Sequence, residues 1–222
     1  MIVTIDGPAG AGKSTVARRL ADRLKVAYLD TGAMYRAIAL RAIRADVPTD
    51  DAERLTRLAA EADLQLACDR DGVRVVLDGE DVTEAIRTMA VNEATSRIAK
   101  VQGVRDVLVR QQQEIGRRLG SLVTEGRDQG SVVFPDADVK FLVEADVETR
   151  TKRRSDEMRR DGQDVAHEDV RCNLIERDDR DAPRWAPLTA PGAAVRIDTS
   201  AMTVDEVVDR MAEEIRVRAV GD

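Results

Sequence analysis

The chain has 222 residues, a formal net charge of −7 and an aromatic content of 2%. This length suits one α/β domain with a small insertion, and the acidic balance argues against a nucleic-acid polymer as the main partner. A single histidine, His167, excludes chemistry built on a histidine pair, and the distant Cys68 and Cys172 predict neither a disulfide framework nor a zinc site.

The N-terminal part of the chain alternates between strand and helix patterns. A β-rich run at 2–5 precedes the loop DGPAGAGKST, and apolar residues at helical spacing follow over 13–25. A second strand is predicted at 26–30 and a second helix at 33–43. Strands that alternate with helices in this way are typical of a parallel sheet.

The pattern changes in the middle of the chain. Residues 64–77 alternate between apolar and polar side chains, and Asp71-Gly72 is a hairpin turn signal within them. Residues 83–118 have a helical pattern. A small antiparallel β insert therefore interrupts the α/β alternation.

Three short apolar strands return in the second half, separated by helical stretches, at 121–124, 139–143 and 194–198. A C-terminal helix begins at the capping signal Thr203-x-x-Glu206. The sequence therefore predicts an α/β fold with about five parallel strands flanked by helices, to which the antiparallel insert is added.

Nothing in the sequence indicates a membrane or a partner subunit. No apolar run approaches the length that spans a bilayer, and the N-terminus MIVTIDGPAG lacks the basic region and apolar core of a secretory signal. No segment has a leftover apolar face. We therefore expect a cytoplasmic monomer with no membrane partner.

The segment GPAGAGKS matches the phosphate-loop pattern GxxxxGK[ST], and it lies between a predicted strand and a predicted helix, as that motif requires. Its glycines let backbone N–H groups converge, and the helix N-terminus adds positive potential. We expect Lys13 to reach the outer phosphates and Ser14 to ligate Mg²⁺. The predicted ATP-binding residues are Gly7, Pro8, Ala9, Gly10, Ala11, Gly12, Lys13, Ser14 and Thr15.

A phosphate loop suits both a phosphotransferase and a nucleotide-dependent switch. A guanine-binding switch is expected to carry NKxD, but neither Asn92 nor Asn173 precedes a lysine. A motor-type ATPase is expected to have an apolar strand that ends in Asp-Glu, and the sequence has none. A small kinase is therefore favoured.

Five blocks in order resemble the bacterial-type cytidylate kinases, which are P-loop nucleoside monophosphate kinases: IDGPAGAGKST, YLDTGAMYR, LDGEDVTEAIRT, EGRDQGSVVFPDA and ERDDRDAPR. The resemblance covers the whole chain. It implies a core at about 1–40 and 105–222, an insert over the acceptor nucleotide at about 60–100, and a mobile lid at about 150–165.

The resemblance implies that CMP is bound by Thr31, Arg36, Ser96, Arg105, Arg127, Asp128, Arg177, Asp181 and Arg184. Within this set, Arg36 and Arg127 would contact the phosphate, whereas Arg177 and Asp181 would hold the ribose hydroxyls. Ser96, Arg105 and Asp128 would face cytosine. A carboxylate suits the cytosine amino group, and Arg and Ser donors suit its N3 and O2 acceptors.

The resemblance also implies that the lid arginines close over the transferring phosphoryl group: Arg150, Arg153 and Arg154. We expect Lys13, Arg127 and Arg154 to be catalytic. The attacking phosphate has a second pKa of about 6 and is already ionised at neutral pH, so no general base is needed. Catalysis would then depend on positioning and on neutralisation of charge.

The sequence thus predicts a kinase that uses ATP and Mg²⁺ to convert CMP and dCMP into CDP and dCDP. Two alternatives stay open at this point. One is a P-loop kinase of another small acceptor, such as UMP or a coenzyme precursor. The other is a nucleotide-binding regulatory protein.

Overall fold

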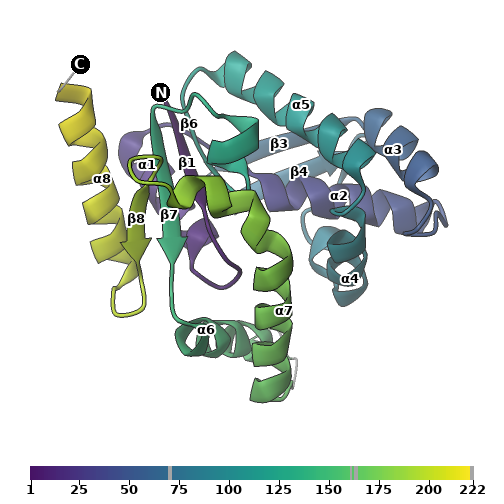
Figure 1. Ribbon diagram of the computed structural model, residues 1–222. Coiled ribbons are helices and arrows are strands. Elements are labelled where there is room, and N and C mark those ends of the chain that lie inside the picture. Colours follow the sequence, from purple (N-terminus) through teal and green to yellow (C-terminus); the bar gives the residue numbers. More distant parts are fainter. Residues whose placement is uncertain (70–71, 161, 163–164, 221–222) are drawn as a thin grey trace. The chain divides into compact units, whose positions relative to one another are not determined.

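A computed structural model describes residues 1–69, 72–160, 162 and 165–220 (Figure 1). The chain folds as two compact units. The first consists of residues 1–28 and 121–222, and the second consists of residues 29–120.

The main sheet has five parallel strands in the order β2-β6-β1-β7-β8. Strands β6, β1, β7 and β8 are labelled in Figure 1. These strands are β1 (Ile2–Asp6), β2 (Ala27–Asp30), β6 (Leu122–Glu125), β7 (Val139–Glu144) and β8 (Val195–Asp198). Strand β1 pairs with both β6 and β7, and β7 pairs with β8. Val3, Ile5 and Phe141 have no exposed surface, so the middle of the sheet forms the core of the first unit. The strands expected from the apolar runs are confirmed.

Helices α1 (Lys13–Leu24) and α8 (Val204–Val220) pack against each other in the first unit (Figure 1). Helix α8 begins with the predicted capping box. The Thr203 backbone N–H donates to Glu206 Oε2 at 2.8 Å, and the Glu206 N–H donates to the Thr203 hydroxyl at 3.3 Å. One apolar face of α8 is buried: Val207, Val208, Met211 and Ile215.

Helices α6 (Val147–Arg160) and α7 (His167–Trp185) form the rest of the first unit, with the short 3-10 helix η3 (Ala186–Thr189) after α7. Ala9 of the phosphate loop packs with Val170 and Leu174 of α7. Trp185 packs with Leu142 of β7 at the other end of α7. The phosphate loop and the sheet are therefore both in contact with α7. Within the predicted lid, residues 161, 163 and 164 lie outside the described residues.

The second unit contains a small antiparallel sheet in the order β3-β4-β5. Its strands are β3 (Leu64–Asp69), β4 (Gly72–Leu77) and β5 (Glu80–Asp81). This confirms the antiparallel insert. At the predicted hairpin turn, Gly72 pairs with Asp69, and Asp71 lies outside the described residues.

The helices of the second unit are α2 (Thr31–Arg44), α3 (Ala52–Ala60), the 3-10 helix η1 (Ala85–Arg87), α4 (Met89–Ile98) and α5 (Gln102–Leu119). The helical pattern over 83–118 thus resolves into three separate helices. Helix α3 is an addition to the expected elements. The Asp51 side chain caps it by accepting a hydrogen bond from Arg54 N at 3.0 Å, and Leu55 and Leu58 are buried beneath it.

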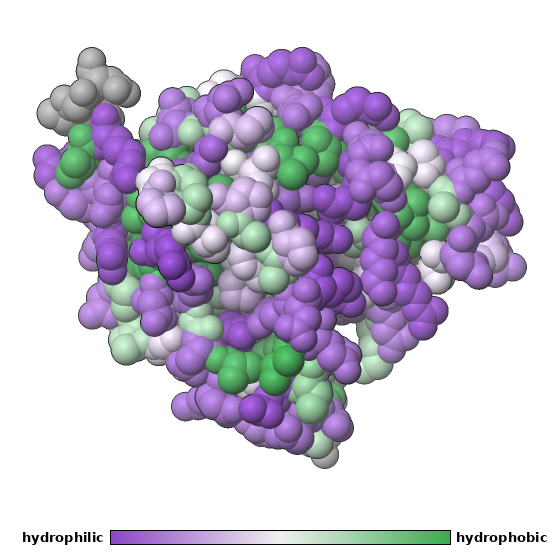
Figure 2. Space-filling view, in the orientation of Figure 1, coloured by the Kyte–Doolittle hydropathy of each residue, from purple (hydrophilic) through white to green (hydrophobic). Residues whose placement is uncertain are grey.

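Most of the face shown in Figure 2 is hydrophilic, with hydrophobic residues in small groups. Large exposed hydrophobic side chains belong to different elements, such as Ile43 of α2, Leu119 of α5 and Val217 of α8. Among the described residues, no helix is both long and apolar enough to cross a membrane.

Candidate functional site

The phosphate loop connects the end of β1 to the start of α1, as the sequence predicts. Gly7 has a φ of 140°, and a Cβ at this position would lie 2.0 Å from the carbonyl oxygen of Val143. Gly12 has a φ of 86° at the N-cap of α1. Only glycine adopts these conformations without strain, so the loop depends on both residues.

Lys13 is buried at the start of α1, and its Nζ donates a hydrogen bond to the Pro8 carbonyl oxygen at 2.7 Å. Burial and, next, the nearby charge of Arg127 lower the pKa of Lys13 to about 7, although the carboxylates of Glu125 and Asp6 oppose this shift. The two carboxylates therefore compensate only in part for the burial of the Lys13 ammonium group and for its repulsion by Arg127.

Ser14 lies beside Lys13, and its hydroxyl donates a hydrogen bond to Glu125 Oε1 at 2.9 Å. Glu125 is the buried last residue of β6. Hydroxyl and carboxylate oxygens are the donors that Mg²⁺ prefers, and Mg²⁺ is usually bound through one or two protein groups together with substrate phosphates. Within the described part of the chain, no group of three or more His, Cys, Asp or Glu side chains could hold a metal ion by itself. The donor set therefore fits a Mg²⁺ ion that arrives with a nucleotide.

The turn at 126–130 carries Arg127 and Asp128 and is attached to β1 through Asp6. Asp6 Oδ1 accepts a hydrogen bond from the Gln129 N–H at 2.8 Å, and Oδ2 accepts one from the Gly130 N–H at 2.7 Å. Burial raises the pKa of Asp6 to about 6, and these two amides act in the opposite direction. Asp128 is buried, and its carbonyl oxygen begins the π-helix η2 (Gln129–Val133) by accepting from the following turn.

Arg127 meets the polar side chains of α7. Its Nε lies 3.4 Å from Asp181 Oδ2, and Asp181 is buried. Burial and, next, the charge of Arg127 lower the pKa of Arg177 to about 10. Arg127 and Arg177 also both lower the pKa of Lys13. Lys13, Arg127 and Arg177 therefore converge on one region, which we call the cationic centre.

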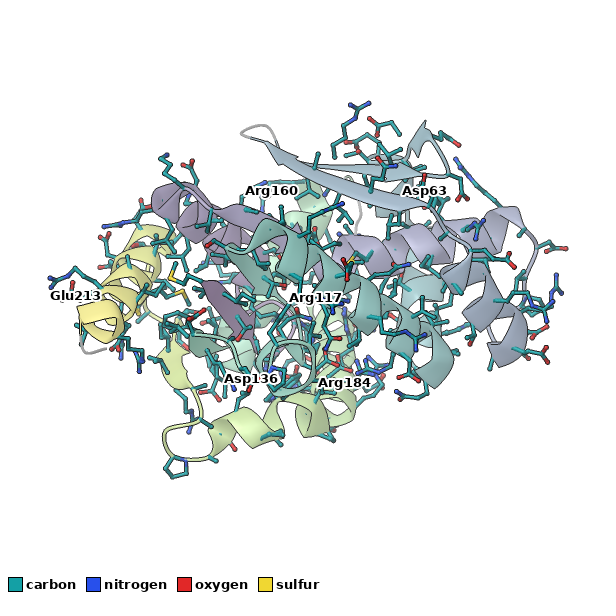
Figure 3. The ribbon with its side chains drawn as sticks, turned by 90° about the horizontal axis from the view of Figure 1, so that it is seen from above. Asp63, Arg117, Asp136, Arg160, Arg184 and Glu213 are labelled. Carbon is teal, nitrogen blue, oxygen red and sulfur yellow. The ribbon has the colours of Figure 1, made fainter. Side chains whose placement is uncertain are left out.

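Arg184, labelled in Figure 3, lies near the C-terminal end of α7. Its Nη1 is 3.6 Å from Asp181 Oδ1, and its carbonyl oxygen accepts a hydrogen bond from the Ser131 hydroxyl at 2.8 Å. Asp181 thus lies between Arg184 and Arg127, and Ser131 connects the end of α7 to η2.

The three lid arginines lie on α6 and have different partners. Arg150 is buried, and its Nη1 pairs with Asp178 Oδ2 of α7 at 2.6 Å. Arg153 donates to the carbonyl oxygen of Thr199 at 2.8 Å. Arg154 pairs with the exposed Glu157 of its own helix at 2.7 Å. Its charge also lowers the pKa of Arg177, so Arg154 is the lid arginine that lies toward the cationic centre.

The other predicted acceptor residues belong to the second unit. Thr31 is buried at the first position of α2, directly after Asp30, and Arg36 Nη2 lies 3.2 Å from Asp30 Oδ2. The Ser96 hydroxyl donates to the Asn92 carbonyl oxygen of its own helix at 3.3 Å. Arg105 lies near the N-terminal end of α5.

The chain matches one known family over nearly its whole length. Residues 3–217 match the family model described as Cytidylate kinase. The chain belongs to the cytidylate kinase family. It is 44% identical over 221 residues to a cytidylate kinase from Caldanaerobacter subterraneus subsp. tengcongensis, covering 99% of this chain and 96% of that protein. It is 45% identical over 219 residues to a cytidylate kinase from Geobacter sulfurreducens, covering 98% of this chain and 94% of that protein.

A solved structure agrees with the fold of this cytidylate kinase family member. The shikimate kinase from Acinetobacter baumannii, in complex with shikimate, superposes with a TM-score of 0.51 at 16% identity, covering 97% of this chain and 93% of that chain. At this identity the likeness supports the P-loop kinase fold alone. The predicted family and fold are both confirmed.

Two acidic residues of this cytidylate kinase site are not among those predicted from the sequence motifs. Asp6 and Glu125 are the last residues of β1 and β6, which are neighbours in the sheet. Ligands of open parallel sheets bind at the carboxyl ends of the strands. An acidic residue at the end of each apolar run is therefore the sequence feature that could have identified Asp6 and Glu125.

Proposed function

We propose that this protein transfers the γ-phosphoryl group of ATP to CMP and dCMP, which yields ADP with CDP or dCDP. The observation that supports this most is the cationic centre. The charges of Arg127 and Arg177 lower the pKa of Lys13, and the charge of Arg127 lowers the pKa of Arg177, so a bound polyanion would relieve this repulsion. The membership of the chain in the cytidylate kinase family supports the choice of acceptor.

The ATP phosphates would bind along residues 7–15, where the backbone N–H groups and the start of α1 face the loop. Lys13 would exchange its hydrogen bond with Pro8 for one with the outer phosphates. Mg²⁺ would be held by the Ser14 hydroxyl and the nucleotide phosphates, and Glu125 would orient that hydroxyl. When bound, the ion supplies neutralisation of the phosphate charge.

CMP would be bound by the residues that the family resemblance implies. Arg127 and Arg36 would hold its phosphate, and Thr31 and Arg184 would contact the nucleotide. Arg177 and Asp181 are proposed to contact the ribose.

Selectivity would come from the cytosine edge. Asp128 accepts from the cytosine amino group, while Ser96 and Arg105 donate to O2 and N3. Uracil reverses two of these positions, and each unpaired buried polar group costs about 1–3 kcal/mol.

The transfer needs little proton chemistry, because the acceptor phosphate is already ionised. Lys13 and Arg127 would neutralise the charge that develops on the transferring group. Arg154 would join them when the proposed lid at about 150–165 closes and excludes water. We further propose that the protein acts as a monomer in the cytoplasm, with a core at about 1–40 and 105–222 and an acceptor-binding insert at about 60–100.

A coupled assay of ADP release with separate acceptors tests this function. We expect turnover with CMP and dCMP, much slower turnover with UMP, and none with AMP or shikimate. Lys13→Met should abolish the CMP-dependent rate while the protein stays folded. An absence of CMP-stimulated ADP release would overturn the proposal, and activity with UMP or another acceptor instead of CMP would identify a different P-loop kinase.

A further inference from the structure

Asp6 is the buried acid that connects the two halves of the site within the first unit. It is the last residue of β1, directly before Gly7 of the phosphate loop, and it has no exposed surface. Each of its two carboxylate oxygens accepts one backbone N–H from the 126–130 turn, at 2.8 Å from Gln129 and 2.7 Å from Gly130.

The turn has little freedom on the side that faces β1. A Cβ on Gly130 would lie 2.7 Å from Thr4 Oγ1 and 3.3 Å from Asp6 Oδ2. The Thr124 hydroxyl also donates a hydrogen bond to Gln129 Oε1 at 2.9 Å. The backbone that follows Asp128 is therefore held against the strand at close contact.

We propose that Asp6 is a positioning residue which fixes the 126–130 turn to the phosphate loop, so that the Asp128 carboxylate is held where it reads the acceptor base. This inference rests on the proposed function. Arg127 and Asp128 immediately precede the two amides that Asp6 binds, and the peptide after Asp128 cannot rotate while both bonds are made. Asp6 itself contacts neither base nor phosphate in this account.

The ionised form of Asp6 is the form that can do this. Burial raises its pKa, but only to about 6, because the two amides and Lys13 favour the carboxylate. A carboxylate offers acceptor oxygens in both directions, whereas an asparagine amide offers one oxygen and one NH₂ group. Asp6→Asn therefore keeps the shape of the side chain while one backbone N–H of the turn faces another donor.

The test compares Asp6→Asn with wild type and with Thr4→Val. Thr4 is buried on the same strand, and its hydroxyl has no hydrogen-bond partner among the described residues, so Thr4→Val is a matched control. In Asp6→Asn we expect kcat/KM for CMP to fall by about 10- to 100-fold, mainly through KM, and the ratio of CMP to UMP use to narrow. The affinity for ATP should be unchanged, and Thr4→Val should behave as wild type in all three measurements.

A second variant tests the proposal if Asp6→Asn folds poorly, and hydrogen exchange adds a structural measurement. Gly130→Ala displaces the same turn by another route, because its added Cβ would lie 2.7 Å from Thr4 Oγ1, and we expect the same loss of CMP affinity and of base selectivity. Amide hydrogen exchange in the ligand-free protein should show faster exchange at Gln129 and Gly130 in Asp6→Asn, and no change there in Thr4→Val. This readout is independent of catalysis.

The outcomes separate this inference from the proposed function. If wild type shows no CMP-dependent ADP release, the proposed function is wrong, and the exchange data alone decide whether Asp6 holds the turn. If wild type is active but Asp6→Asn and Gly130→Ala keep the wild-type CMP selectivity and KM, the positioning role of Asp6 is overturned. Loss of ATP affinity with CMP selectivity retained would also overturn it, since Asp6 would then serve the phosphate loop.

Discussion

Arg150 of α6 and Asp178 of α7 form an ion pair with an Nη1–Oδ2 distance of 2.6 Å. The same guanidinium donates to the carbonyl oxygen of Ala9 in the phosphate loop at 3.2 Å and to that of Ala145 at 2.9 Å. The Arg150 side chain is only 7% exposed. One arginine therefore connects the phosphate loop to α6 and α7.

This pair should contribute measurably to stability. In Asp178→Ala the Arg150 guanidinium is left buried without its counter-charge, and we expect the free energy of unfolding to fall by about 2 kcal/mol, less than for a fully buried pair because Asp178 is 23% exposed. Urea denaturation measures this directly. The control is Glu157→Ala, which removes the exposed partner of Arg154 and should change the free energy by less than about 0.5 kcal/mol. Equal effects of the two changes would contradict this assignment.

Arg154 should act on the rate and not on stability. Its ion-pair partner Glu157 is exposed, while its charge lowers the pKa of Arg177 in the cationic centre. We expect Arg154→Ala to lower kcat by about 100-fold or more, because an arginine that meets the transferring phosphoryl group acts mainly in the transition state. The thermal midpoint should stay the same. Arg159→Ala removes an exposed arginine of the same helix and should leave kcat unchanged; a similar loss in both variants would indicate a general effect of charge.

Nucleotide binding should take up a proton through Lys13. Its pKa of about 7 in the ligand-free protein leaves the amine largely neutral at about pH 8, and bound phosphates favour the ammonium form. Titration calorimetry of ATP binding in buffers of different ionisation enthalpy should show uptake that approaches about one proton at pH 8 and falls toward pH 6. Lys13→Met should show no such difference between the two pH values. Uptake that is absent in wild type would mean that Lys13 is charged before ATP binds.

The same shift has a consequence for stability in the absence of ligand. The folded-state pKa of Lys13 lies below its ordinary value of 10.5, so the unfolded chain binds more protons between about pH 7 and 10.5. The contribution of Lys13 to the free energy of unfolding therefore rises with pH in that window. Asp6 acts in another window. Its folded-state pKa is raised from 3.8 to about 6, so its contribution falls as pH rises from about 3.8 to 6.

Glu125 should govern the requirement for Mg²⁺. It accepts the Ser14 hydroxyl hydrogen bond, and partners that orient a metal ligand typically change affinity for the metal by about 10-fold or more when they are replaced. Glu125→Gln should therefore raise the Mg²⁺ concentration that gives half-maximal activity. Glu144→Gln, at the end of strand β7 in the same sheet, is the control, because Glu144 pairs with the exposed Arg196. If both variants need the same Mg²⁺ concentration as wild type, Glu125 does not orient Ser14.

Local sequence patterns were sufficient for the elements that carry their own signal. The strands of the main sheet are runs of apolar residues that become fully buried, as Val3, Ile5 and Phe141 show. The phosphate loop is constrained by backbone geometry that only glycine tolerates, so its sequence specifies its conformation. Helix α3 has a weaker signal, a single aspartate cap at Asp51 and a short apolar face, and the pattern analysis did not include it.

The site was harder to predict, because side-chain partners depend on how distant segments meet. The run RTKRR does not reveal that Arg150 binds Asp178, Arg153 binds Thr199, and Arg154 lies toward Arg177. Asp6 and Glu125 lie in two of the five sequence blocks, IDGPAGAGKST and EGRDQGSVVFPDA, but the blocks alone assign them no role. Their roles appear only when parallel strands place the ends of β1 and β6 side by side.

We propose that the Asp128 carboxylate accepts a hydrogen bond from the amino group of cytosine. Initial rates with CMP and UMP for wild type and Asp128→Asn are the most direct measurement of this role. An asparagine amide can rotate to offer either an acceptor or a donor, so it suits either base. We predict that wild type prefers CMP by about 100-fold or more in kcat/KM and that Asp128→Asn loses most of this preference, with ATP affinity unchanged. Equal use of CMP and UMP by wild type, or full selectivity in Asp128→Asn, would contradict the account.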